Sequence, residues 1–470
     1  MTAGAGTEQL IIVGSGVAGL ALALGAGRAG LDVTLLERDP APPAPSVEAA
    51  FEATRRGAPQ VHQTHGFLAR LTSVLRERYP DILQALLEAG ARELPLTREL
   101  GEPRPGDEEL AILVLRRTTL EWVLRRAVLA EPNVSVRSGI GVVGLLADAS
   151  HPAPIVRGAR LDDGSEISGT VAACTGRRGD VPAWLAAIGV AVDETVHETH
   201  LVYLTRWYRQ LSDEELILPP RLGGDLGFLK YLAVPCDGGT FSVTLAVPVS
   251  DAELRSSLQD PEWFEATCRV LTGPGEFFRH GELEALGPVL PMGGLVNRIR
   301  RFTTSSGEPL VTGFHAVGDA HTCTNPLYGR GCALAFVQAT LLVDAFAAHP
   351  GDLLARAGAY EAASGREVEP WYHGAVEWDR YRPGQRNGDG NGESPSDVFA
   401  RVAAEGGTDP VIGRAIIRLF NLLTRPDQLL TDPEFMARVA PIVANPNPKP
   451  PPAPEGPSRE EVLALGGSPR

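Results

Sequence analysis

IIVGSGVAGLALALGAGRAGLDVTLLER, residues 11–38, is the stretch that decides the fold of this chain. It reads as a short apolar strand, a turn with the spacing G-x-G-x-x-G, an apolar helix, and a second strand that ends in an acidic residue. Gly14 permits the tight turn, Gly16 lets a pyrophosphate approach the backbone, and Gly19 lets the helix pack closely on the sheet. Glu37 ends the second strand, where its carboxylate can accept hydrogen bonds from a ribose. The pattern predicts a dinucleotide site with the pyrophosphate at the helix N-terminus, and a glycine-rich turn that only packs is the alternative.

A second glycine-rich segment, residues 311–338, indicates which dinucleotide is bound. It reads VTGFHAVGDAHTCTNPLYGRGCALAFVQ: a strand, the pair Gly318-Asp319, a glycine-rich turn, and a segment with helical periodicity. FAD has a ribityl chain that needs a carboxylate acceptor and a pyrimidine ring that needs N–H donors. Asp319 would serve the ribityl hydroxyls, and the backbone of Leu327–Gly331 with the helix N-terminus would face the N1/O2 side of the ring. FAD is therefore the predicted cofactor, and a surface loop is the alternative.

Length, charge and cysteine content exclude several classes of protein. The chain has 470 residues and a net charge of −15, and it contains no basic run, which argues against a nucleic-acid partner. No signal-peptide pattern precedes the first strand, and no uninterrupted apolar segment reaches the ~18 residues of a membrane span. We therefore expect a soluble, cytoplasmic protein. The five cysteines form no C-x-x-C pair, so neither a disulfide framework nor a metal site is predicted.

Two motifs occupy the middle of the chain. Arg117 opens an amphipathic segment, and its guanidinium could match the oxygens of a pyrophosphate, although a solvated charge at a helix start is the alternative. Residues 171–190, VAACTGRRGDVPAWLAAIGV, read as a strand, a glycine turn and a helix. Together the motifs give these candidate cofactor-binding residues: Gly14, Gly16, Gly19, Glu37, Arg38, Arg117, Gly318, Asp319, Pro326, Gly329 and Gly331.

The predicted architecture is α/β, with a Rossmann-like FAD-binding domain interleaved with a mixed β-sheet substrate domain and followed by C-terminal helices. Residues 201–249 are sheet-like, since β-branched and aromatic residues alternate between turn signals. Residues 384–396 are expected to form a flexible loop. The expected boundaries are 1–70, 105–196 and 286–350 for the FAD-binding domain, 71–104 for a substrate-side segment, 197–285 for the substrate sheet, 351–444 for the helices, and 445–470 for a Pro-rich tail that is extended or disordered.

In this order the motifs resemble those of the FAD-dependent monooxygenases with the para-hydroxybenzoate hydroxylase fold. More narrowly, they resemble bacterial flavoprotein epoxidases that act on polyether-antibiotic polyketides and are related to squalene epoxidase. The resemblance covers most of residues 8–375. Besides the motifs quoted above it includes Ala58-Pro59-Gln60, His65-Gly66-Phe67-Leu68, Leu201-Val202-Tyr203, Thr205-Arg206, Tyr208-Arg209, Asn297-Arg298, Arg300-Arg301 and Glu369-Pro370-Trp371.

The chain departs from the family pattern at positions that lie near the flavin in the family. Ala173 stands where the family has an aspartate, and Gly179 stands where it has a serine. The family's P-Q-x-R-H-x-H segment reads PQVHQTH here, so that His62 and Gln63 replace an arginine and a histidine. These departures bear on how the flavin is reduced.

The resemblance implies epoxidation or hydroxylation of a hydrophobic natural-product or polyketide-like intermediate, with O2 as co-substrate and a flavin C4a-hydroperoxide as the oxygen donor. Because the chain has a single G-x-G-x-x-G, either NAD(P)H docks transiently or a separate flavin reductase supplies the electrons. A flavin halogenase, an FAD-dependent reductase or dehydrogenase, and a catalytically silent flavoprotein are the alternatives.

Catalytic residues are not identified by the sequence, since flavin chemistry needs no nucleophile from the protein. The candidates for flavin-adjacent or pocket positions are His65, Tyr203, Arg206 and Trp207. Tyr203 and Trp207 fall on one face of the expected strand, and Arg206 falls on the other. The alternation is compatible with either face lying toward the flavin.

Overall fold

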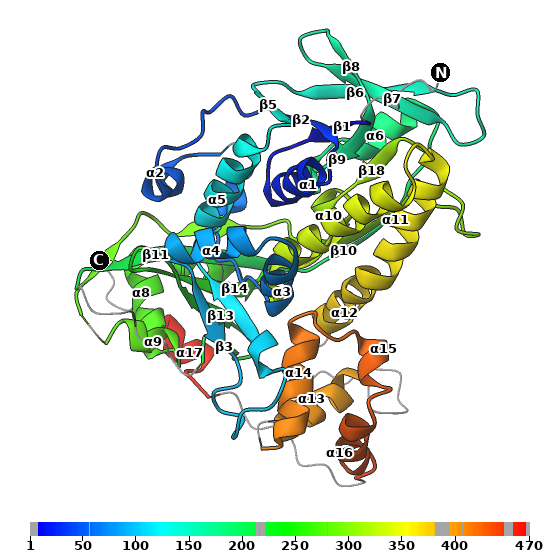
Figure 1. Cartoon of the computed structure of the whole chain (residues 1–470). Coiled ribbons are helices and arrows are strands. Elements are labelled where there is room, and N and C mark those ends of the chain that lie inside the picture. Colours follow the sequence, from blue (N-terminus) through cyan, green and yellow to red (C-terminus); the bar gives the residue numbers. More distant parts are fainter. Residues whose placement is uncertain are drawn as a thin grey trace.

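The computed structural model of the protein (Figure 1) describes residues 8–55, 57–212, 216, 221–279, 281–380, 395–406, 408–445 and 455–466. Residues 384–394 of the predicted flexible loop lie outside the described residues, and its last two residues begin helix α13. The expected α/β class is confirmed, because a parallel sheet, further sheets and C-terminal helices are all present (Figure 1).

The first motif lies at the centre of a five-stranded parallel sheet with the order β18-β9-β1-β2-β5. Val13 of β1 lies opposite Leu36 of β2 and Ala173 of β9, so the carboxyl ends of these strands meet at one edge. The apolar run of β1 is buried on both faces, as the central strand of a parallel sheet requires. The strands are β1 (Gln9–Val13), β2 (Asp32–Glu37), β5 (Val134–Ser138), β9 (Thr170–Ala173) and β18 (Phe314–Ala316).

Helices cover one face of this sheet and a small sheet covers the other. Leu10 and Ile12 pack with α1 (Val17–Arg28), α5 (Arg117–Ala130) and α10 (Gly331–Ala348). Ile11 and Val13 pack with the second layer, which contains β6 (Val142–Asp148), β7 (Ile155–Leu161), β8 (Glu166–Ser168) and α6 (Val181–Ala186). Helix α10 is apolar and long enough to cross a membrane by length and composition, but 61% of it is buried inside the molecule, as in a core helix.

The predicted substrate sheet is antiparallel, with the order β12-β13-β14-β11-β15 and with β16 also paired to β11. Its outer face, which includes Leu204 and Tyr208, packs in one core with α7 (Ala252–Ser257), α8 (Pro261–Val270) and α9 (Pro274–Phe277). Its strands are β11 (Leu201–Gln210), β12 (Gly223–Asp225), β13 (Lys230–Pro235), β14 (Thr240–Pro248), β15 (Leu283–Ala285) and β16 (Leu290–Met292).

A buried ion pair fixes this sheet to the domain that contains the parallel sheet. Asp237, in the turn between β13 and β14, accepts hydrogen bonds from the backbone N, Nε and Nη2 of Arg116 at 2.7, 2.8 and 2.6 Å. Thr119 of α5 donates to the same carboxylate at 2.7 Å. Arg116 and Asp237 are 1% and 2% exposed, so the contact is shielded from solvent.

Smaller elements join the two domains. A three-stranded sheet, β10-β17-β19, connects the second motif to the middle of the chain. A hairpin of β3 (Arg92–Pro95) and β4 (Ala111–Val114) flanks the substrate sheet. The remaining bounds here are β10 (Asp193–Glu198), β17 (Val296–Arg301), β19 (Thr322–Cys323), α2 (Val47–Glu52), α3 (Ala69–Arg78) and α4 (Pro80–Glu88).

The C-terminal part is helical as expected, and the prediction of an extended or disordered tail is wrong for residues 459–464, which form a helix. Helix α17 (Arg459–Ala464) lies beside α8 and α9 (Figure 1), with Val462 fully buried and its carbonyl accepting from Trp263 Nε1 at 2.9 Å. Ser458 and Glu461 cap its start reciprocally. The other helices are α11 (Leu353–Glu367), α12 (Glu369–Arg380), α13 (Pro395–Gly406), α14 (Pro410–Phe420), α15 (Pro426–Leu429) and α16 (Pro433–Val443).

Candidate functional site

One cavity opens at the carboxyl edge of the parallel sheet and continues to the start of α10. It is bordered by the glycine turn after β1, by residues 57–66, and by the segment that follows β18. The candidate cofactor residues that line it are Gly14, Gly16, Glu37, Arg38, Arg117, Gly318, Asp319, Pro326, Gly329 and Gly331. Gly19 is not in the lining and lies beneath the turn. The structure thus brings together residues that lie far apart in the sequence.

The three glycines of the first motif meet different steric demands. Gly14 has a φ of 102°, and a Cβ there would lie 2.6 Å from the Cys174 carbonyl oxygen. Nothing lies within 4 Å of the position that a Cβ on Gly16 would take, so the backbone is open to the cavity at this point. A Cβ on Gly19 would overlap the Gly14 carbonyl oxygen. The turn therefore offers free approach to an anion at Gly16 and close packing at Gly19.

Glu37 is buried at the end of β2 and keeps acceptor capacity toward the cavity. Its Oε2 accepts from the backbone N and Oγ of Ser15 at 3.0 and 2.6 Å, and Arg55 Nη2 lies 3.3 Å away. Its Oε1 accepts only from the backbone N of Asp39, at 2.9 Å, among the described residues. A carboxylate oxygen can accept two hydrogen bonds, so Oε1 can take a ribose hydroxyl. Arg38 is exposed and lines the same part of the cavity.

Asp319 places a carboxylate in the cavity for which the described part of the chain supplies no hydrogen-bond donor. Burial raises its pKa, and the positive charges of Arg117, Arg177 and Arg298 act in the opposite direction. Its backbone is held by Arg298 Nη2, which donates to the Asp319 carbonyl at 3.0 Å. A partly buried acceptor without a protein donor fits a ligand that brings hydroxyl groups, such as a ribityl chain.

The start of α10 presents its free N–H groups at the same end of the cavity. The turn Pro326–Tyr328 is followed by Gly329, whose φ of 65° lies in the left-handed region. Gly331, the first residue of α10, is so close to Asp319 that a Cβ on it would lie 3.9 Å from Oδ1. Backbone donors and the positive end of the helix dipole therefore lie beside the carboxylate. This arrangement fits the pyrimidine ring of FAD.

Arg117 and His65 are in direct contact. Arg117 donates from Nη1 to Nε2 of His65 at 2.9 Å and from Nε to Oε1 of Glu121 at 2.9 Å. Nδ1 of His65 donates to the Gln63 carbonyl at 2.8 Å. Both Arg117 and His65 line the cavity. Arg117 is thus oriented by two protein partners, which the sequence could not show.

The other three pocket candidates lie on β11. Tyr203 and Trp207 are on the inner face: Tyr203 donates to Asn325 Oδ1 at 2.5 Å, and Trp207 donates from Nε1 to the His62 carbonyl at 2.6 Å. Arg206 points the opposite way, because its guanidinium donates to the Gly287 and Pro261 carbonyls on the outer side. None of these three candidates lines the cavity: strand alternation directs Arg206 away from it, and Tyr203 and Trp207 contact residues beside it.

Residues 58–66, here called the strap, run between the cavity and the inner face of the substrate sheet. Thr205 donates to Gln63 Oε1 at 2.7 Å, and Thr244 donates to Thr64, which in turn donates to Ser242, both at 2.8 Å. Gln63 and Thr64 also line the cavity. These hydroxyl contacts were not predicted, since no sequence motif links the strap to β11 and β14.

The four residues that depart from the pattern of the resembled family differ in whether they reach the cavity. Ala173 is fully buried at the end of β9, and a Cβ on Gly179 would overlap Thr175 Oγ1, so a serine would need a local rearrangement. His62 is directed toward Phe51 and the Ala53 carbonyl, and it is not in the cavity lining, whereas Gln63 is. The cavity therefore carries a neutral amide where the family has a histidine.

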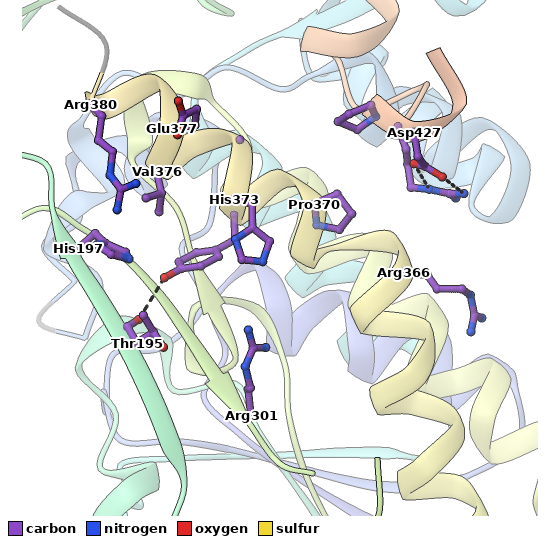
Figure 2. Close-up of a pocket in the computed structure, with 14 residues that line it drawn as sticks. Thr195, His197, Arg301, Arg366, Pro370, His373, Val376, Glu377, Arg380 and Asp427 are labelled. Atoms are coloured by element: carbon purple, nitrogen blue, oxygen red, sulfur yellow. Dashed lines mark hydrogen bonds and ion pairs between the residues drawn. The ribbon is translucent and has the colours of Figure 1, made fainter. Parts of the chain in front are cut away.

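A groove of about 830 Å³ lies beside α12, and both positively and negatively charged side chains line it (Figure 2). Arg301 forms an ion pair with Glu369 at 2.7 Å, and Arg425 forms ion pairs with Glu367 and Asp427 at 2.8 and 3.2 Å. Arg366 and Arg380 also line this groove, and no ion pair to either is present among the described residues, so its cations are only partly paired with carboxylates. In the described residues, no group of three or more His, Cys, Asp or Glu side chains could hold a metal ion.

Comparisons with known proteins agree with this geometry. Residues 9–138 match the protein family described as FAD dependent oxidoreductase. The comparison with curated sequences gives no match. Among solved structures, PqsL from Pseudomonas aeruginosa aligns at 17% identity over 79% of this chain and 94% of its own, with a TM-score of 0.57.

Two further structures show how widely the fold is used. The p-nitrophenol 4-monooxygenase PnpA from Pseudomonas putida aligns at 19% identity over 89% of this chain and 99% of its own, with a TM-score of 0.57. The flavin-dependent brominase Bmp2 aligns at 14% identity over 92% and 97%, with a TM-score of 0.53. At these identities the likeness establishes the fold and not the reaction. The chain therefore has the fold that these flavin-dependent enzymes share, and its residues 9–138 match the FAD dependent oxidoreductase family.

Proposed function

We propose that the protein is an FAD-dependent monooxygenase that transfers one oxygen atom of O2 to a hydrophobic small molecule. The observation that carries the proposal is that Glu37, Gly16, Asp319 and the start of α10 all line one cavity. Glu37, Gly16, Asp319 and the start of α10 would match, in that order, the ribose, pyrophosphate, ribityl chain and flavin ring, and FAD combines all four. When bound, FAD would supply the activation of O2.

The residues of the chain would bind and orient the cofactor. Gly16 and the N-terminus of α1 would hold the pyrophosphate, Glu37 Oε1 a ribose hydroxyl, and Asp319 the ribityl hydroxyls. The N–H groups at the start of α10 would face the ring where negative charge collects on reduction. His65 would keep Arg117 in place beside the cavity.

The substrate would enter at the ring end, where the lining combines apolar and polar groups. Met292, Val296 and Pro326 contribute apolar surface, and Gln63 and Thr64 contribute an amide and a hydroxyl. An apolar site next to a few oriented polar groups favours a hydrophobic substrate with one or two polar anchors. We propose an alkene or an electron-rich ring of a polyketide-like intermediate as the group that is epoxidised or hydroxylated.

The decisive experiment follows the oxygen atom. The FAD-loaded protein, NAD(P)H and, in a parallel arm, a general flavin reductase are incubated under ¹⁸O₂ with a panel of polyenes and phenols. A product that carries one ¹⁸O atom supports the proposal, and the same mixture with the Asp319→Ala variant is the control. A brominated product that forms only with added bromide would instead establish a halogenase. FAD binding without any product would favour a silent flavoprotein and contradict the proposal.

A further inference from the structure

The segment Thr324–Gly331, here called the ring loop, is fastened to the rest of the molecule through Asn325. Asn325 is fully buried, and each of its nitrogen and oxygen atoms forms a hydrogen bond. Its backbone N donates to Asn297 Oδ1 at 2.7 Å, and its Oδ1 accepts from Leu327 N at 3.1 Å and from Tyr203 OH. Its Nδ2 donates to Oδ1 of Asp379 at 2.8 Å. The loop that lines the ring end of the cavity is therefore bonded to β17, β11 and α12.

The carboxylate of Asp379, on α12, accepts hydrogen bonds from three residues that are separated in the sequence. Its Oδ1 accepts from Asn325 Nδ2 and from Tyr328 OH at 2.7 Å, and its Oδ2 accepts from Asn297 Nδ2 at 2.6 Å. Two of these donors belong to the ring loop itself. Within the described residues no Lys, Arg or His forms an ion pair with Asp379, so the carboxylate is engaged by neutral donors alone.

The ring loop also carries a buried cation, Arg330, whose charge interacts with Asp379. Arg330 is 2% exposed, and its guanidinium lies over the rings of Tyr328 and Trp378 at 4.9 and 5.1 Å from their centroids. Nη1 donates to the Trp371 carbonyl at 2.9 Å. Burial lowers the pKa of Arg330 to about 10, and the charge of Asp379 acts in the opposite direction. Arg330 is therefore still protonated at neutral pH, with Asp379 as a counter-charge.

We propose that Asp379 is a positioning residue that holds the ring loop in the shape needed to bind the flavin ring. It does so by joining Asn325, Tyr328 and Asn297 at one carboxylate, and it touches neither substrate nor cofactor. The inference rests on the proposed FAD site, because it assigns a role to a residue that supports that site from outside the cavity.

The test uses three variants of the full chain. Asp379→Asn keeps the size of the side chain but sets an N–H donor against Asn297 Nδ2, and turning the amide only moves the conflict to Asn325. Asn297→Asp combined with Asp379→Asn exchanges donor and acceptor along the same contact, while the carboxylate introduced at position 297 would still accept from the backbone N of Asn325. Glu377→Gln is the matched control, because Glu377 lies on the same helix and lines the groove beside it (Figure 2).

Three quantities are measured: the FAD dissociation constant, the visible circular dichroism of the bound flavin at saturating FAD, and the melting temperature of the apoprotein. We expect Asp379→Asn to raise the dissociation constant about tenfold or more and to change the flavin dichroism. The double variant should return both toward the values of the unaltered protein, and Glu377→Gln should leave them unchanged. Loss of binding that tracks the melting temperature and is not restored in the double variant would overturn the positioning role.

Other outcomes also decide the question. Unchanged affinity and dichroism in Asp379→Asn would show that the carboxylate does not position the loop. If Asp379→Asn does not fold, Tyr328→Phe removes only the hydroxyl that donates to Oδ1, and the inference then requires a weaker change of the same kind. Absence of FAD binding in the unaltered protein would overturn the proposed function itself, which separates that failure from a failure of this inference.

Discussion

Arg117 and His65 form a hydrogen-bonded pair, in which Nη1 of Arg117 donates to Nε2 of His65 at 2.9 Å. The imidazole also donates from Nδ1 to the Gln63 carbonyl, so the ring is neutral and both nitrogens are engaged. Burial, together with the charge of Arg117, lowers the pKa of His65 to about 3. His65 is therefore an orienting residue for a cationic side chain and not an acid or a base at neutral pH.

Replacing His65 by Phe should weaken FAD binding through Arg117. The substitution removes the acceptor of the Arg117 Nη1 hydrogen bond and leaves the bond to Glu121. A hydrogen bond that involves a charged group contributes ~1.5–3 kcal/mol, so part of this amount should appear as a rise of about three- to tenfold in the dissociation constant. Flavin fluorescence titration measures it. His62→Phe is the control, since His62 packs on Phe51 outside the cavity, and equal effects in both variants would contradict the assignment.

Replacing Asp319 by Asn should lower FAD affinity without destabilising the apoprotein. The carboxylate has no hydrogen-bond donor among the described residues, and burial raises its pKa. Removing the charge should therefore not lower the stability of the apoprotein. Bound FAD would lose a charged acceptor of its ribityl hydroxyls, and the dissociation constant should rise about tenfold to a hundredfold. The melting temperature of the apoprotein should stay equal or increase. An unchanged FAD affinity would remove Asp319 from the cofactor site.

The parts of the fold and of the site that could be predicted from the sequence are those in which a short continuous motif contains all the residues involved. The glycine turn after β1, the acidic end of β2 and the glycine-rich segment before α10 each form a continuous motif, so their place at one edge of a parallel sheet followed from strand direction. The helix at residues 459–464 also had a local signal. Ser458 and Glu461 have the spacing of a capping box, and the proline-rich composition before them led to the wrong prediction of a disordered tail.

Contacts between distant segments could not be predicted in this way. Strand alternation separated Arg206 from Tyr203 and Trp207, but only the packing of α7–α9 on one face of the sheet shows which side looks toward the cavity. The bond from Thr205 to Gln63 joins two single residues that no spacing rule connects. The same holds for Asp379, whose partners come from β17 and the ring loop. Long-range polar contacts of this kind depend on the completed fold.

The buried histidine of β18 should make stability depend on pH. His315 is 2% exposed, and burial together with Arg356 lowers its pKa to about 3, whereas an unfolded histidine has a pKa near 6.5. The unfolded chain therefore binds the proton first, and stability falls as the pH decreases from about 6.5 toward 3. At about pH 5 this difference amounts to roughly 2 kcal/mol.

His315→Phe should reduce that dependence, because it removes the group that the unfolded state protonates. Urea unfolding of both proteins between about pH 7 and pH 5 measures the change. His200→Phe, at a position that is exposed in the structure, is the control and should keep the slope of the unaltered protein. A slope that is the same in His315→Phe and in the unaltered protein would show that His315 is not buried in its neutral form.

Reduction of the bound flavin by NAD(P)H alone should be slow when no substrate is present. The chain has one dinucleotide turn, which the proposed FAD occupies. Near the ring end, Gln63 lines the cavity in place of a histidine, and His62 is directed away from it. A cationic contact that is missing beside a nicotinamide phosphate costs ~1–3 kcal/mol, or about five- to 150-fold in affinity.

Anaerobic stopped-flow measurements at the flavin absorbance maximum test this expectation with NADH and NADPH separately. Dithionite is the control, because it should bleach the same flavin completely and so show that the ring can be reduced. Adding a general flavin reductase with NADH should restore rapid reduction, since free reduced flavin can then supply the electrons. Fast and saturable bleaching by either nucleotide alone would instead mean that the nicotinamide has a productive docking site on this chain. In that case Gln63, Ala173 and Gly179 would be neutral replacements of the family residues, and the enzyme would need no partner.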